Sequence, residues 1–238
     1  MVLQETAEAA ERSGDLEAAF EAWQTLSSID ADRPDYLCKL GRVAQKLGRW
    51  ACAEQAFLDA IKVDIKKDDK TLRMHWFAIA MLGSLFLARA DGDRWANAQK
   101  AKTWLGQAFA LSPTPMSLTF LGTAHIRLGE REAAKEAFRK AIQLDESYEE
   151  AYFNLGLLLA NDGQNDEAEK LLRRATQLDP NYHLAHGRLG ILLQEQGRYS
   201  EAVSELKRAV EIDPTDKTAR YYLSRIPGSL AADAGLSD

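Results

Sequence analysis

The chain has 238 residues, of which 46% are hydrophobic and 28% charged, and its formal net charge is −6 at pH 7. These proportions are typical of a soluble globular protein, and the negative balance argues against a nucleic-acid partner, which needs clustered lysine and arginine. The longest apolar stretch, Trp76 to Ala88, is too short to span a membrane, so no membrane insertion is predicted. Residues 1–5 lack a basic region before an apolar core, so no signal peptide is expected. The two cysteines, Cys38 and Cys52, are expected to be reduced, which favours a cytoplasmic protein.

Residues 1–67 contain two predicted helix–turn–helix repeats. The first repeat, 1–33, is rich in glutamate, which suits the polar outer face of a terminal repeat. The second repeat, 34–67, begins with Pro34, a residue that the first turn of a helix tolerates.

The third repeat, 68–114, is irregular because it carries two surplus segments. One runs from Asp68 to His75 and is expected to extend a helix, and the other surrounds Trp95. One interpretation is a lengthened helix pair with a larger local core. The alternative is a protruding second binding surface.

The last three repeats, 115–148, 149–182 and 183–216, show the period most clearly. Four columns of small residues recur every 34 residues: Gly122, Gly156 and Gly190; Gly129, Gly163 and Gly197; Ala134, Ala168 and Ala202; and Ala141, Ala175 and Ala209. Self-similarity at this period indicates an array of helix–turn–helix units. The first glycine column predicts a close approach of two helices opposite the first alanine column. The second predicts the left-handed residue that ends a helix.

The end of the chain departs from the repeat. Asp179-Pro180 and Asp213-Pro214 are expected to end the second helices of their repeats, because proline disfavours helical geometry in the residue before it. Residues 217–226 carry apolar side chains at helical spacing and predict a capping helix, followed by a disordered tail, 227–238.

These columns resemble the tetratricopeptide repeat. In 149–182 the large and small positions of that family are occupied by Tyr152, Leu155, Gly156, Leu159, Ala168, Leu172, Ala175 and Pro180. The resemblance covers residues 1 to about 216. It implies an all-α fold, a right-handed α-solenoid of six helix pairs plus the capping helix, whose concave face binds a peptide or protein.

The resemblance also implies which first-helix positions face the concave groove. In repeats two to six they are Asp35, Cys38, Lys39, Arg42 and Gln45; Phe77, Ala80, Met81, Ser84 and Leu87; Met116, Thr119, Phe120, Thr123 and Ile126; Glu150, Phe153, Asn154, Leu157 and Ala160; and Leu184, Gly187, Arg188, Ile191 and Gln194. The groove thus begins polar and becomes apolar from the third repeat onward.

Two known binding modes of the family have residue requirements at these positions. The carboxylate clamp for chaperone C-termini matches only Asn154 and Arg188. The asparagine ladder of the O-linked GlcNAc transferase array needs asparagine at one groove position of successive repeats, and here that position holds Lys39, Met81, Phe120, Asn154 and Arg188. Capture of apolar side chains remains. The predicted partner-binding residues are Arg42, Phe77, Met116, Thr119, Thr123, Phe153, Asn154, Leu157, Arg188 and Ile191. Phe153 is expected to meet water, so that Phe153→Glu would leave stability nearly unchanged.

No motif supports catalysis, a cofactor or a metal site. His183 and His186 lie three residues apart, but no further ligand stands at a recognisable spacing, so both are interpreted as structural. The sequence therefore predicts a non-catalytic scaffold or adaptor that binds a protein or peptide. The alternatives are a targeting or regulatory module of an enzyme, such as a glycosyltransferase or sulfotransferase, and a self-assembling scaffold that forms homo-oligomers.

Overall fold

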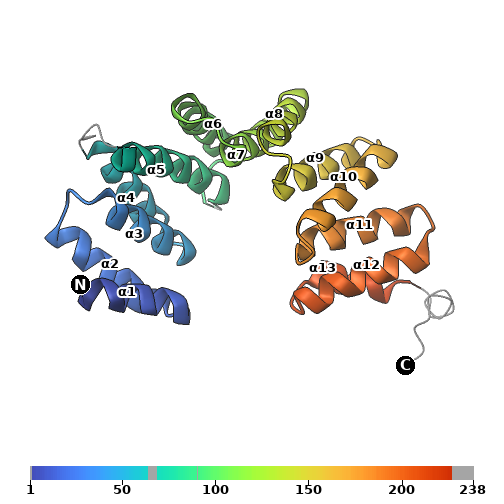
Figure 1. The fold of residues 1–238 in the computed structure, drawn as a ribbon, viewed down its shortest axis with the longest axis horizontal. Helices are drawn as coiled ribbons and strands as arrows, with labels where there is room; N and C mark the ends of the chain where they lie inside the picture. Colours follow the sequence, from blue (N-terminus) through green and yellow to red (C-terminus); the bar gives the residue numbers. More distant parts are fainter. Residues whose placement is uncertain (1, 64–68, 90, 227–238) are drawn as a thin grey trace. The chain divides into compact units, whose positions relative to one another are not determined.

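The computed structural model describes residues 2–63, 69–89 and 91–226. Over these residues the chain forms thirteen α-helices and no β-strand (Figure 1). The predicted all-α class is therefore confirmed. The predicted tail, 227–238, lies outside the described residues.

Two compact units divide the chain between Ala134 and Lys135. Unit 1 holds α1 (Val2–Ser13), α2 (Leu16–Ile29), α3 (Pro34–Lys46), α4 (Trp50–Lys62), α5 (Asp69–Ala88), α6 (Arg94–Leu111) and α7 (Pro115–Arg127). Unit 2 holds α9 (Glu149–Asn161), α10 (Asn165–Leu178), α11 (His183–Glu195), α12 (Tyr199–Ile212) and α13 (Lys217–Ser224), and the boundary falls inside α8 (Arg131–Leu144). Each predicted repeat contains one helix pair, and α13 lies in the predicted capping segment.

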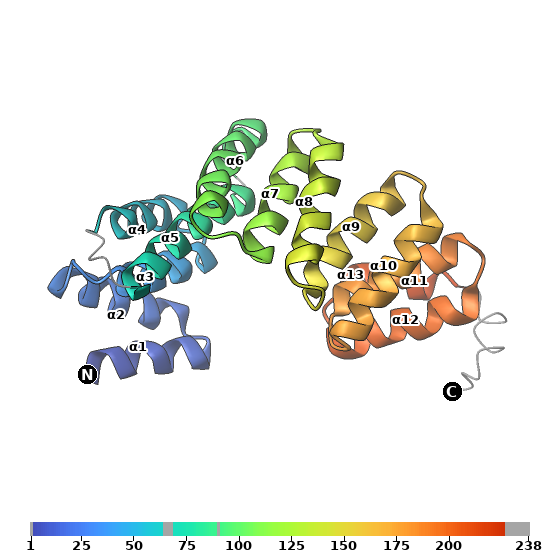
Figure 2. The same ribbon diagram turned by 45° about the horizontal axis from the view of Figure 1, so that its top comes forward.

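Within each unit the two helices of a pair pack against each other. The contacts join α1 to α2, α3 to α4 and α5 to α6 in unit 1, and α9 to α10 and α11 to α12 in unit 2, as the turned view in Figure 2 shows. In unit 1 the first helices α3, α5 and α7 also contact one another in succession. These three helices therefore form one continuous face. In unit 2, α13 contacts both α11 and α12.

The predicted glycine column lies where paired helices approach closely. A Cβ atom added to Gly190 would lie 2.7 Å from Cγ of Leu206, and one added to Gly156 would lie 3.1 Å from Cγ of Leu172 and 3.3 Å from the carbonyl oxygen of Ala168. Carbon atoms in favourable contact are about 3.5–4.0 Å apart, so a side chain at these positions would push the helices away from each other. Ala168 is the partner that the spacing predicts for Gly156.

The second glycine column ends the first helix of its pair in the left-handed conformation. Gly14, Gly48, Gly129, Gly163 and Gly197 have φ angles between 70° and 81°. At Gly163, for example, its N–H donates to the Ala160 carbonyl at 3.0 Å, and the next N–H donates to the Leu159 carbonyl at 2.9 Å. This is the Schellman pattern of helix ends, which glycine adopts without a steric penalty. The predicted conformation is confirmed.

The third helix pair is lengthened. α5 has 20 residues and α6 has 18, whereas α3, α4 and α7 have 13 each. Leu82 and Phe86 of α5 and Leu105 of α6 are buried in the core of unit 1, but all three lie outside the two surplus segments, so a larger local core stays a prediction. Trp95, in the first turn of α6, is 59% exposed. A second binding surface around Trp95 stays a prediction, and Asp68 lies outside the described residues.

Ion pairs join successive repeats on the surface of unit 2. Arg173 contacts Glu169 at 2.9 Å and Glu201 at 2.7 Å, and Arg198 contacts the same two carboxylates at 2.7 Å. Because each side chain serves two partners, the four-membered network holds α10 to the start of α12 better than one exposed pair, which contributes about 0–1 kcal/mol.

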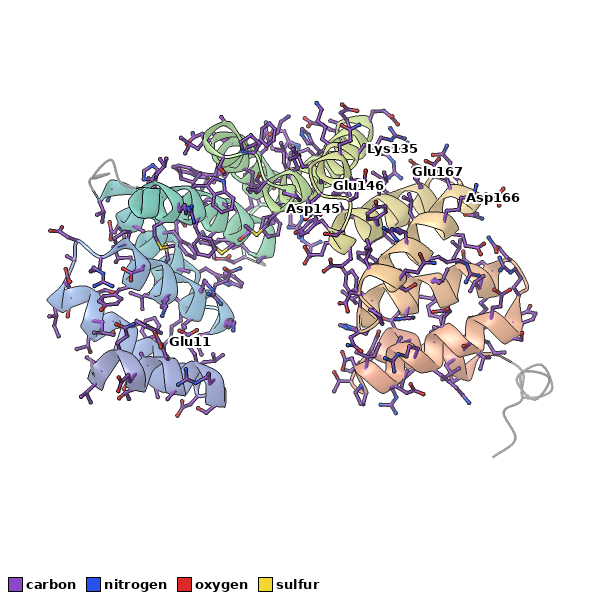
Figure 3. All side chains as sticks on the ribbon, viewed as in Figure 1. Glu11, Lys135, Asp145, Glu146, Asp166 and Glu167 are labelled. Atoms are coloured by element: carbon purple, nitrogen blue, oxygen red, sulfur yellow. The ribbon has the colours of Figure 1, made fainter. Side chains whose placement is uncertain are left out.

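The first turn of α10 carries two acidic residues, Asp166 and Glu167, which are labelled in Figure 3. The helix dipole favours carboxylates at this end of a helix.

The two cysteines of the second repeat lie in different environments. Cys38 on α3 is buried, Cys52 on α4 is exposed, and both are free. Burial raises the pKa of the Cys38 thiol to about 12, so this residue carries almost no reactive thiolate at neutral pH. We expect iodoacetamide to label the native protein once, at Cys52, and the denatured protein twice, as counted by mass spectrometry. Rapid labelling of Cys38 in the native protein would contradict its burial.

Candidate functional site

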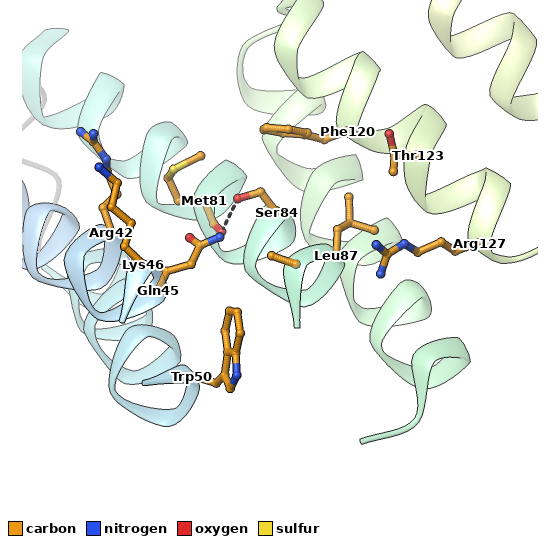
Figure 4. Close-up of a pocket in the computed structure, with 11 residues that line it drawn as sticks. Arg42, Gln45, Lys46, Trp50, Met81, Ser84, Leu87, Phe120, Thr123 and Arg127 are labelled. Carbon is orange, nitrogen blue, oxygen red and sulfur yellow. Dashed lines mark hydrogen bonds between the residues drawn. The ribbon is translucent and has the colours of Figure 1, made fainter. Parts of the chain in front are cut away.

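An open cavity of about 640 Å³ lies on the face formed by α3, α5 and α7. Eleven residues line it: Arg42, Gln45, Lys46, Trp50, Met81, Ser84, Leu87, Ala88, Phe120, Thr123 and Arg127. Figure 4 shows the α5 side chains between those of α3 and those of α7. We call this cavity the unit 1 groove. It needs three stacked first helices, because no single repeat supplies its walls.

The floor of the groove is apolar and backed by the core. Trp50, Met81 and Phe120 are half-buried and pack against the core cluster of unit 1, and Leu87 belongs to that cluster. The Ser84 hydroxyl donates to the Met81 carbonyl at 2.9 Å, so its donor is already used within α5 (dashed line in Figure 4). Because its side chains pack against the core, the floor holds its shape before a ligand arrives.

The rim of the groove carries positive charge. Arg42 and Lys46 of α3 and Arg127 of α7 are exposed, and none of the three makes a hydrogen bond or ion pair with another described residue. Lys46 and Arg127 are the last residues of their helices, where a basic side chain interacts favourably with the helix dipole. The groove therefore combines an apolar floor with cations that are available to a ligand.

A second cavity, of about 430 Å³, adjoins the first and is lined by Leu87, Ala88, Arg89, Arg94 and Arg127. Arg89 is already paired, at 2.7 Å to both Glu54 and Asp91. Arg94 makes no hydrogen bond or ion pair within the described part of the chain. Burial and the neighbouring Arg94 charge lower the pKa of the Arg127 guanidinium. Two unneutralised guanidinium groups thus face one cavity and repel each other.

Five of the predicted partner-binding residues lie in unit 1, and two of them, Arg42 and Thr123, line the groove. Phe77 instead packs against a separate buried cluster, and Met116 is half-buried at the start of α7. Thr119 is 5% exposed, and its hydroxyl has no hydrogen-bond partner among the described residues. Ten of the eleven lining residues come from α3, α5 and α7, and Trp50 comes from the start of α4.

Phe153 in unit 2 corrects a prediction. Its side chain is buried, with 8% of the residue exposed, and its ring centroid lies 5.1 Å from that of Tyr182. The expectation that Phe153 meets water is therefore wrong. Tyr182 directly precedes α11, and its ring covers Phe153 at the contact between two successive repeats.

The other predicted residues of unit 2 do not share one large cavity. Asn154 donates its amide to the Glu150 carbonyl at 2.7 Å, and Leu157 is half-buried. Arg188 and Ile191 line a small pocket of about 60 Å³ that also involves residues of α13, and Ile191 is itself buried. A space of this size is too small for an ordinary ligand.

Four lining residues of the groove were missed by the sequence analysis: Lys46, Trp50, Ala88 and Arg127. Lys46 and Arg127 could have been found from the sequence, because each follows directly after the last groove column. Each also lies at the C-terminal end of its helix, where the helix dipole favours a cation. Trp50 lies outside the first helices to which the groove columns belong. It is the first residue of α4, packs against the core cluster of unit 1 and also lines the groove.

The histidines near the start of α11 contact carboxylates. His186 Nδ1 lies 2.7 Å from Glu205 Oε2, and His183 Nε2 lies 3.7 Å from Asp213 Oδ2. Within the described residues, no group of three His, Cys, Asp or Glu side chains could hold a metal ion. In the same part of the chain, no helix has both the length and the apolar character needed to cross a bilayer.

Comparison with known proteins identifies the repeat. Residues 121–183 and 183–216 match two family models, each described as tetratricopeptide repeat. No curated protein matches the sequence significantly. A chain of the APC/C hetero-tetramer Cut9–Hcn1 has a TM-score of 0.70 and 17% identity over 91% of this chain, and this chain covers 40% of its length. YrrB, described as a TPR protein with an unusual peptide-binding site, has a TM-score of 0.51 and 20% identity, with 87% and 100% of the two chains covered. These matches identify residues 121–216 as tetratricopeptide repeats, and the helix pairs with their packing glycines extend the same architecture over the other described residues.

Proposed function

We propose that this chain is a non-catalytic protein-interaction module whose unit 1 groove binds a peptide segment of a partner protein. The observation that carries this proposal is the open cavity with an apolar floor on the joint face of α3, α5 and α7. None of the eleven lining residues carries a carboxylate, imidazole or thiol, so no such group lines the groove to activate Ser84, Thr123 or Lys46, and the groove suits binding better than acid–base or nucleophilic chemistry. We place the protein in the cytoplasm.

The energetics of the groove support this proposal. Burying one large apolar side chain contributes about 1.5–3 kcal/mol, and a few such anchors dominate most interfaces. Because Trp50, Leu87 and Phe120 are already packed against the core, little side-chain entropy is lost when a ligand covers them. The fold is shared with YrrB, which is described as having a peptide-binding site, and this likeness supports the proposal.

A selection experiment tests the proposal. The full chain is immobilised and used to enrich binders from a random library of peptides about twelve residues long, and the affinity of the best synthetic peptide is measured by fluorescence anisotropy. Ser84→Trp places an indole in the middle of the groove, where it should fill the cavity and weaken binding by about tenfold or more. Ser204→Trp, at an exposed position of α12 in unit 2, is the matched control and should leave the affinity unchanged.

Two results would reject this function. A selection that enriches no peptide above the blank support would reject peptide binding. Equal affinity of the wild type and Ser84→Trp would show that the peptide uses another surface, and the exposed Trp95 would then be the next residue to replace. A mass that rises with protein concentration, measured by light scattering, would favour self-assembly instead.

A further inference from the structure

The cations around the groove are arranged on both sides of its apolar floor. Arg42 and Lys46 come from α3, and Arg127 comes from α7, with the floor residues of α5 between them (Figure 4). Arg94 extends the positive side into the adjoining cavity beyond Arg127. The whole chain has a net charge of −6, so this surface has the opposite sign to the average of the protein.

These cations lack the partners that other arginines of unit 1 have. Arg33 donates two hydrogen bonds to the Asp35 carboxylate, at 2.9 and 2.7 Å, and Arg89 donates two to the Asp91 carboxylate, at 2.7 and 3.2 Å. Such paired, charge-assisted hydrogen bonds match a guanidinium to a carboxylate and are stronger than neutral ones. The unpaired guanidinium groups of the groove are therefore capable of the same contact with a carboxylate from outside.

We propose that the bound segment carries one large apolar side chain with aspartate or glutamate residues on both sides of it. The apolar side chain would lie on Trp50, Leu87 and Phe120. Carboxylates on one side would pair with Arg42 and Lys46, and those on the other side with Arg127 and Arg94. This inference rests on the proposed function, since it specifies the chemistry of the segment that the groove binds.

Two physical arguments favour this occupant over a neutral or basic segment. Arg94 and Arg127 line one cavity without an anion, so a carboxylate between them would replace repulsion by attraction. A basic segment would instead add to the repulsion. Opposite charges at the rim also speed the encounter of the partners, while the apolar floor supplies most of the binding free energy.

The composition of the selected peptides is the first test. Peptides enriched by the wild type should carry aspartate or glutamate on both sides of an aromatic or large aliphatic residue. The best peptide is then synthesised in two forms, one acidic and one with each Asp replaced by Asn and each Glu by Gln. The amide form should bind about tenfold more weakly at low salt, and the difference should shrink at about 1 M salt, where screening is strong.

The second test couples the peptide charges to the groove. Arg127→Gln should weaken the acidic form by about tenfold and leave the amide form nearly unchanged, because the variant removes only the charged contact. Arg220→Gln, at an exposed position of α13, is the matched control and should change neither affinity. Circular dichroism melting of each variant checks that the fold is intact.

The outcomes separate this inference from the proposed function. If the enriched peptides lack acidic residues but bind the Ser84→Trp variant more weakly than the wild type, the inference is overturned and the proposed function stands. An acidic preference that Arg127→Gln does not reduce would also overturn it. An empty selection would instead reject peptide binding itself.

Discussion

Phe153→Glu is expected to lower the free energy of unfolding by at least about 3 kcal/mol, the usual cost of removing a buried phenylalanine ring. The loss arises because the ring packs against that of Tyr182, and a carboxylate in this buried position would lose its hydration. Burial raises the pKa of the Tyr182 phenol, and the nearby charges of Glu150 and Glu149 raise it further. The surroundings of Phe153 are therefore already negative. Urea unfolding followed by circular dichroism measures the effect.

Leu184→Glu provides the matched control for that substitution. Leu184 lies in the first turn of α11, is 44% exposed and also belongs to a predicted groove column. A carboxylate there meets water, so its effect on stability should stay within about 0.5 kcal/mol. If the two variants proved equally mild, Tyr182 would not cover Phe153 in solution, and the original expectation for Phe153 would be restored.

Gly83→Ala and Gly106→Ala are expected to change stability in opposite directions, although both lie in the third helix pair. The new methyl at residue 83 would lie 2.5 Å from Leu105, a fully buried side chain, so overpacking should cost about 1–3 kcal/mol. At residue 106 the new methyl would meet nothing within 4 Å, and alanine restricts the unfolded chain and favours the helix. A gain of about 0.4–1 kcal/mol is expected.

Equilibrium unfolding in urea measures both glycine variants against the wild type. The two substitutions add the same atoms to helices of one pair, so differences in composition cancel. A neutral Gly83→Ala would mean that α5 and α6 do not approach closely at this point. A destabilising Gly106→Ala would mean that the space beside residue 106 is filled in solution.

Local chemistry allowed the helix pairs to be predicted from the sequence. Glycine at a left-handed position such as Gly163, and proline after Asp179, end helices by backbone sterics that involve only neighbouring residues. The packing glycines were predictable for a related reason. A repeat places the same pair of helices in contact each time, so Gly156 and Ala168 meet wherever the period of 34 residues holds.

The composition of the candidate site was only partly predictable. The groove columns include Met81, Leu87 and Phe120, which line the cavity, and also Phe153, which does not. A repeat position defines the direction of a side chain from its own helix. It does not define what the next repeat lays over that side chain. Phe153 is buried because a tyrosine precedes α11, which is a property of the contact between repeats.

The charge pattern of the groove depended on tertiary structure alone. Lys46, Arg94 and Arg127 are separated by tens of residues and belong to three different helices. In the sequence they are three basic residues among thirty in an acidic chain. Stacking of the helix pairs brings them to the groove and its adjoining cavity, and only the structure shows that neither Lys46 nor Arg127 has an acidic partner within the described residues. The sequence by itself therefore determined the fold through short-range backbone and packing rules. The charges that face a ligand were decided by long-range contacts, because Coulomb interactions depend on distances in space and not on separation along the chain.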